Sequence, residues 1–73
     1  MFKSVKTIVH KDGKRRVVFW CRENGTFFYE QEYWDEDEYH SCWVPYGRPV
    51  AGIYDSLETA EREATGNISW LAG

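Results

Sequence analysis

The chain has 73 residues, of which 13 are aromatic, and it carries nine Lys and Arg against twelve Asp and Glu. So short a chain can build one hydrophobic core, and we expect a single domain over residues 1–73. No apolar run approaches the roughly 18 residues of a membrane-spanning helix, and the aromatic content excludes a disordered chain. Residues 1–6 lack the apolar core of a signal peptide, which predicts a cytoplasmic protein with no membrane contact.

Three stretches rich in β-branched and aromatic residues predict long antiparallel strands at 2–10, 15–22 and 26–34. Asp12-Gly13 and Asn24-Gly25 lie between them, and such pairs supply the positive φ angles of two-residue hairpin turns. After an acidic turn at 35–38, a shorter fourth strand is expected at 39–44. The prolines of the segment 45–49 break regular structure, and 50–54 is a candidate fifth strand.

A helix is predicted over residues 56–66, with Asp55 as its N-cap and Glu58 closing a capping box. Its apolar residues recur at helical spacing and form one stripe, made of Leu57, Ala60, Ala64 and Ile68. Gly66-Asn67 ends the helix, and the apolar tail 68–71 is expected to fold back onto the core. The predicted fold class is α+β: a small antiparallel β-meander of four strands, or five with 50–54, and one C-terminal helix packed on one face.

Two-residue turns would fix the register of both hairpins, so that Val5 faces Trp20 and Trp20 faces Tyr29. Side chains alternate along a strand, which sorts the residues onto two faces. The less charged face is expected to receive the helix; it contains Val5, Val9, Val18, Trp20, Phe27, Tyr29 and Tyr33.

The other face would be only partly shielded, because one helix cannot cover both sides of a four-stranded sheet. It is the candidate interaction face, and its residues are Ile8, Val17, Phe19 and Phe28, with Lys6, Glu30 and Glu32 around them. A mixed apolar and charged surface of this kind is typical of protein contacts. The alternative is that residues 45–54 and the C-terminal tail fold over it.

The charges are unevenly distributed, with seven basic residues and one acid in residues 1–22, and eleven acids and two arginines in residues 23–73. This pattern indicates either a binding surface or neighbouring strands that neutralise each other. A basic hairpin beside sheet aromatics also resembles single-strand nucleic-acid platforms. The contacts for that alternative would be Lys11, Lys14, Arg15 and Arg16, although the chain as a whole is acidic.

We find no pattern for catalysis, a cofactor or a metal. His10, Cys21, His40 and Cys42 lack the close pairing of structural zinc ligands, and a Cys21–Cys42 disulfide is not expected in a reducing compartment. Neither cysteine has a base positioned to activate it, and the acidic run 35–38 lacks a calcium-loop pattern.

The sequence therefore predicts a non-catalytic interaction module that binds a protein partner or forms a homodimer. Single-stranded nucleic acid is the alternative ligand. In a homodimer, the basic first hairpin of one copy could lie against the acidic residues 30–38 of the other.

Overall fold

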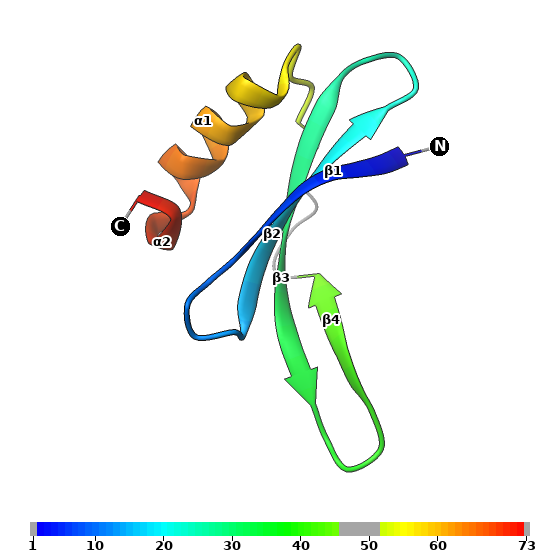
Figure 1. The fold of residues 1–73 in the computed structure, drawn as a ribbon, viewed down its shortest axis with the longest axis vertical. Coiled ribbons are helices and arrows are strands. Elements are labelled where there is room, and N and C mark those ends of the chain that lie inside the picture. The colour runs from blue at the N-terminus through cyan, green and yellow to red at the C-terminus, as the bar shows by residue number, and fades with distance from the viewer. Residues whose placement is uncertain (1, 46–51, 73) are drawn as a thin grey trace.

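The computed structural model of the protein describes residues 2–45 and 52–72. Its elements, in chain order, are β1 (Phe2–Val9), β2 (Arg15–Arg22), β3 (Phe27–Glu36), β4 (Ser41–Pro45), α1 (Leu57–Asn67) and the short α2 (Ser69–Ala72). The strands form one antiparallel sheet in the order β1-β2-β3-β4, and both helices lie on the same side of it (Figure 1). The predicted α+β meander with a C-terminal helix is confirmed. Neither helix has the length and apolar character needed to cross a membrane.

The candidate fifth strand lies partly in residues 46–51, outside the described residues. Within the described part, Tyr54 makes an isolated antiparallel bridge to Phe27. The Phe27 N–H donates to the Tyr54 carbonyl at 2.8 Å and the Tyr54 N–H donates back to Phe27 at 3.0 Å. This bridge holds the chain beside β3 shortly before α1 begins at Leu57.

The first hairpin has the predicted register close to its turn, although the turn itself is longer than expected. The His10 N–H donates to the Arg15 carbonyl at 2.8 Å, and residues 11–14 form the loop, with Gly13 at φ +72°. Val9 lies opposite Arg16, as predicted. Farther from the turn the register shifts at Val5, so that Ser4, and not Val5, lies opposite Trp20. Such a β-bulge adds one residue to one strand.

The second hairpin differs from the prediction by one residue. The Arg22 N–H donates to the Thr26 carbonyl at 2.8 Å, leaving the three residues 23–25 in the loop. Gly25 has φ +85°, and no described residue other than a glycine has a positive φ. Asn24 therefore does not adopt the conformation of a two-residue Asn-Gly turn, and the loop has the three-residue form that ends in a left-handed glycine. Cys21 consequently lies opposite Phe27 instead of Phe28.

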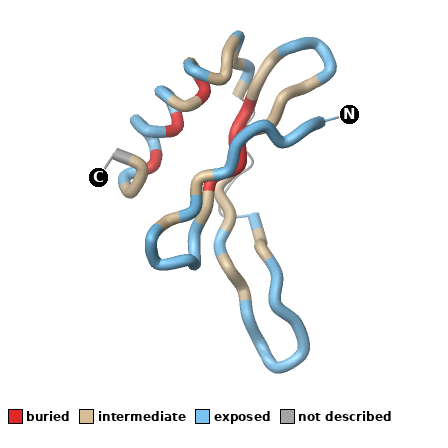
Figure 2. Tube along the Cα trace, in the orientation of Figure 1, coloured by how far each residue is buried: buried red, intermediate tan, exposed pale blue. Residues whose placement is uncertain are grey.

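This one-residue difference reverses the predicted faces of β2. Val17 and Phe19 are fully buried beneath α1, and they form the core with Tyr29, Ala60, Ala64 and Ile68. The prediction that Val9, Val18 and Trp20 face the helix is wrong, whereas Tyr29 lies on the helix side as expected. In Figure 2, buried segments occur both along α1 and along the central strands. We call the side that carries α1 the covered face and the other side the opposite face.

Helix α1 begins one residue later than predicted. The N-cap is Ser56, whose side-chain oxygen accepts a hydrogen bond from the Thr59 N–H at 3.1 Å, so the assignment of Asp55 to this position is wrong. Ala60 and Ala64 are fully buried because their small side chains let the helix approach the large rings of Phe19 and Tyr29. The tail folds back as expected: Ile68 is buried, and Trp70 and Leu71 pack against the core.

The end of β3 and the first residues of β4 form an arm, residues 34–43, that extends beyond the first hairpin (Figure 1). The Trp34 and Trp43 rings pack edge to face with centroids 5.4 Å apart. The guanidinium of Arg16 lies 4.3 Å from the centroid of the Trp43 ring and so ties the base of the arm to β2. At the tip, an Asp37 carboxylate oxygen accepts hydrogen bonds from the Tyr39 and His40 N–H groups at 2.7 and 2.9 Å.

Two isoleucines offer a matched test of the core. Ile68 is 3% exposed and Ile53 is 77% exposed. Ile68→Ala should lower the free energy of unfolding by about 2–4 kcal/mol, because it removes buried apolar volume. The same substitution at Ile53 should change it by less than about 0.5 kcal/mol. Equal losses for the two variants in urea denaturation would contradict the packing of the C-terminal segment.

Two glycines test the left-handed conformation at the end of the second hairpin loop. Gly25→Ala should destabilise the fold by about 1–2 kcal/mol, because a side chain at φ +85° is strained. Gly66→Ala, in α1 with open space around the added methyl, should stabilise it by about 0.5 kcal/mol. Thermal denaturation measures the sign of each change in stability, and a neutral Gly25→Ala would speak against a left-handed Gly25.

Candidate interaction surface

The residues of the predicted interaction face do not share one face in the structure. Lys6, Ile8, Val17 and Phe19 lie on the covered face, whereas Phe28, Glu30 and Glu32 lie on the opposite face, as follows from the register of β2 with its two neighbours. The cause is the three-residue turn of the second hairpin. Val17 and Phe19 are 0% exposed, so they belong to the core and are not available to a partner.

Two of the charged residues predicted to surround that face make ion pairs within the chain. Lys6 pairs with Glu61 of α1 across the edge of the covered face. Arg16 Nε donates to Glu32 Oε1 at 2.6 Å on the opposite face, where the Glu32 side chain is only 13% exposed. The basic first half and the acidic second half of the chain therefore neutralise each other in part between neighbouring elements.

Phe28 lies at the centre of an aromatic cluster on the opposite face. The Phe2 ring packs against its edge with centroids 5.1 Å apart, and the Trp20 ring stacks on it at 6.3 Å. The Arg22 guanidinium lies 4.3 Å from the centroid of the Phe28 ring. Phe28 is left 6% exposed, so its contribution is mainly to packing, while Phe2 remains 59% exposed.

β1 carries three exposed apolar side chains, while Tyr33, Tyr39 and Ile53 are exposed elsewhere. Phe2, Val5 and Val9 are 59%, 41% and 51% exposed, and all three belong to this one strand. β1 is the first strand in the sheet order, and no described strand pairs with its outer side. Its outer backbone N–H and C=O groups therefore form a free edge of the kind on which another strand can pair.

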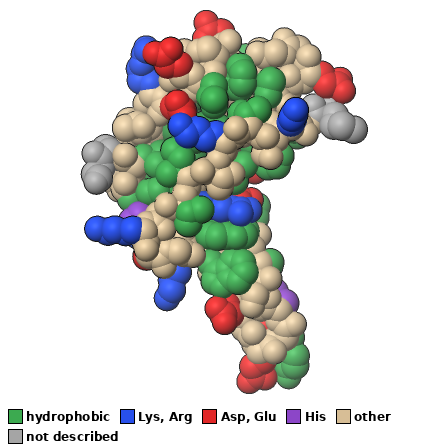
Figure 3. Space-filling view, viewed as in Figure 1, with side chains coloured by type: hydrophobic (Ala, Val, Ile, Leu, Met, Phe, Trp, Pro, Cys, Tyr) green, Lys and Arg blue, Asp and Glu red, His purple; other side chains and the backbone are tan. Residues whose placement is uncertain are grey.

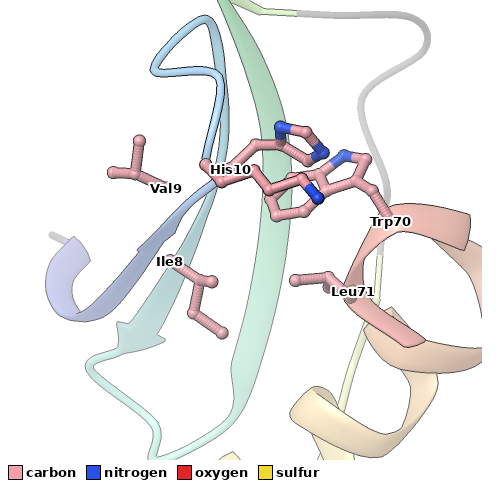
Figure 4. A pocket seen from close by; sticks show the side chains of 6 residues that line it. Ile8, Val9, His10, Trp70 and Leu71 are labelled. Carbon is pink, nitrogen blue, oxygen red and sulfur yellow. The ribbon is translucent and has the colours of Figure 1, made fainter. Parts of the chain in front are cut away.

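A hollow lies at each end of β1. The first, of about 500 Å³, is lined by Ile8, Val9, His10, Lys11, Trp70 and Leu71. In Figure 4 the Ile8 and Leu71 side chains approach each other from β1 and α2, and the His10 and Trp70 rings meet above them. Those two rings pack edge to face with centroids 5.0 Å apart. The second hollow, of about 630 Å³, is lined by Phe2, Lys3, Val5, Cys21, Arg22 and Glu23.

The residues predicted to contact nucleic acid are divided between two places. Lys11, Lys14 and Arg15 are exposed at the first hairpin loop and its border, where Arg15 Nη2 lies 3.2 Å from Asp12 Oδ2. Arg16 points to the opposite face and contacts Glu32 and Trp43. Figure 3 shows several basic side chains beside this loop, separated by tan and green surface.

The residues weighed as metal ligands stay apart within residues 2–45 and 52–72, where no three His, Cys, Asp or Glu side chains are placed to hold an ion. His40 Nδ1 lies 3.1 Å from Asp37 Oδ2 at the tip of the arm, while His10 lies against Trp70. Cys21 is half-buried and Cys42 is exposed, and both are free thiols.

Comparison with known proteins found a similarity to a small part of a much longer protein. A stretch of 68 residues, 93% of this chain, is 37% identical to part of ATP-dependent 6-phosphofructokinase 7 from Arabidopsis thaliana. The chain spans 12% of the length of that protein. No family model matches the chain, and no solved structure matches it.

Asp12 provides a pH-dependent test of the loop beside β1. The Lys14 backbone N–H, which donates to Asp12 Oδ1 at 2.8 Å, lowers the pKa of this carboxyl below 3.8, with further help from Arg15. A lowered folded pKa means that the unfolded chain binds the proton more readily, so this contribution to stability is present above about pH 4 and is lost as the pH falls. A carboxyl ¹³C titration should give a midpoint for Asp12 below 3.8; a midpoint at or above that value would contradict the loop geometry.

Proposed function

We propose that the chain is a non-catalytic interaction module that binds a protein, either a partner or a second copy, through β1 and the side chains beside it. The observation that carries this proposal is the exposure of Phe2, Val5 and Val9 along one strand whose outer edge is unpaired in the described structure. Apolar side chains around a free sheet edge provide the two components of strand-mediated binding, backbone hydrogen bonds and side-chain contacts.

The position of α1 supports the choice of β1 over the face predicted from the sequence. α1 packs over β2 and β3, and its buried residues Ala60 and Ala64 meet Val17 and Phe19 of the central strand. β1 lies outside that contact. Within the described residues, Ile8 packs against the core, Lys6 pairs with Glu61, and His10, which follows β1, lies against Trp70. Its outward surface is thus left for an external partner.

The similarity to part of 6-phosphofructokinase 7 concerns the kind of protein in which such a stretch occurs. The matching stretch takes in nearly all of this chain and a small part of that protein, which suits a unit that can accompany other domains. The activity in that protein's name is not proposed for this chain, because 12% of an enzyme's length does not carry its catalysis.

A photoreactive phenylalanine analogue placed at Val9 tests the proposal. In cells expressing the full chain, irradiation should produce protein adducts at Val9 in excess of those formed by the same analogue at Arg62, which lies exposed on α1. Intact-mass analysis distinguishes the two partner classes, because a second copy gives an adduct of twice the chain mass.

Equal labelling at the two positions, or no adduct at Val9, would contradict the proposal. Titration with fluorescent single-stranded oligonucleotides at low salt, where phosphate contacts are strongest, tests the other ligand class. Tight binding that is abolished by Lys11→Ala and Lys14→Ala would favour nucleic acid in place of a protein.

A further inference from the structure

We infer that the partner of β1 is a protein segment that is extended and acidic, and that adds to the sheet as a fifth strand beside β1. This inference rests on the proposed function and specifies the chemistry of the ligand. Three features of the edge carry it: the unpaired outer side of β1, the excess of positive charge along it, and the hollow at its C-terminal end.

The register of β1 with β2 assigns each β1 side chain to a face. Lys3, Lys6 and Ile8 lie opposite Cys21, Phe19 and Val17 and so share the covered face. Ser4, Thr7 and Val9 lie opposite Trp20, Val18 and Arg16 and share the opposite face. Residues directly opposite in an antiparallel pair lie on the same face. A strand added to β1 therefore places one set of its side chains beside Lys3, Lys6 and Ile8.

The charge along this edge selects an acidic segment. β1 and the loop that follows it contain Lys3, Lys6, Lys11 and Lys14, with Asp12 as their one acidic residue. Lys6 is paired with Glu61, but Lys3 and Lys11 make no ion pair within the described part of the chain. Opposite charges on neighbouring strands stabilise the pairing and like charges oppose it.

The same features disfavour a second copy of β1 as the occupant. Two basic edges placed side by side would repel each other, because each contributes Lys3, Lys6 and Lys11. Lysines on an exposed edge oppose pairing with a strand that is not acidic. An acidic strand turns the lysine repulsion into attraction, so the edge discriminates between the two occupants.

The hollow next to Ile8 adds a requirement for one apolar residue. It is lined in part by Ile8, Trp70 and Leu71 and has a volume of about 500 Å³. The partner residue opposite Ile8 lies over this hollow, whereas the one opposite Lys3 meets the basic part of the edge. On β2 the residues opposite Lys3 and Ile8, Cys21 and Val17, are four positions apart. The expected ligand thus carries an Asp or Glu and a large apolar residue four positions apart.

A displayed library of random peptides of about ten residues, long enough to pair with an eight-residue strand, tests the inference on the full chain. Selection should enrich peptides with the acidic and apolar pair at that spacing. In ¹H–¹⁵N spectra, a synthetic peptide of the enriched sequence should shift the amide signals of residues 2–9 more than those of α1. Lys3→Glu should weaken its binding by about tenfold, whereas Arg62→Glu, which makes the same change in net charge on α1, should alter it less than about twofold.

Enriched peptides that lack acidic residues, or that shift signals elsewhere, would overturn the inference, and so would a selection with no enrichment. Self-association detected by sedimentation equilibrium and abolished by Lys3→Glu would also overturn it, in favour of a second copy. These outcomes are separable from failure of the proposed function, because cross-linking at Val9 reports any protein at this surface, whatever its charge.

Discussion

The three-residue turn at Glu23–Gly25 is the constraint on which the rest of the structure depends. It ends in a left-handed Gly25 and places Cys21 opposite Phe27. Because side chains alternate along β2, this choice sends Phe19 and Val17 to the helix and Trp20 and Val18 away from it. One residue more or less in the loop would exchange the two sets and present a different surface to solvent.

The packing that follows from this register explains why β1 is left exposed. Phe19 and Tyr29 stand side by side with ring centroids 6.0 Å apart, and the buried alanines of α1 fit against them. The 11-residue helix α1 packs on β2 and β3, so it covers the middle of the sheet and not the β1 edge. The short α2 then brings Trp70 against His10, which closes the core at one corner and leaves a hollow beside Ile8.

Much of the fold could be predicted from the sequence because its signals are local. The β-branched strands, the positive-φ glycines and the spacing of Leu57, Ala60, Ala64 and Ile68 each depend on a few neighbouring residues. The length of a turn is not determined by neighbouring residues alone. Asn24-Gly25 is compatible with a two-residue turn and with the three-residue form, and the choice between them depends on tertiary packing. The shift of the N-cap from Asp55 to Ser56 is an error of the same kind, since both residues are good caps.

The candidate site was harder to predict than the fold for the same reason. The sequence assigns its residues by face, so the one-residue error in the second hairpin places the buried Phe19 on the predicted interaction face. The bulge at Val5 carries no local signal in the sequence and was also missed. A sequence signal for the edge was present nonetheless: β1 is the first strand of a meander, and such a strand has a neighbour on one side only.

The register itself is tested most directly by nuclear Overhauser contacts between the sheet aromatics and the methyl groups of α1. The structure predicts contacts from the Phe19 ring to the Ala60 and Ala64 methyls, because all three belong to one buried cluster. It predicts none from the Trp20 indole, whose ring stacks with Phe28 on the opposite face. Contacts from Trp20 to Ala60 or Ala64, with none from Phe19, would contradict the account and reverse its assignment of the two faces.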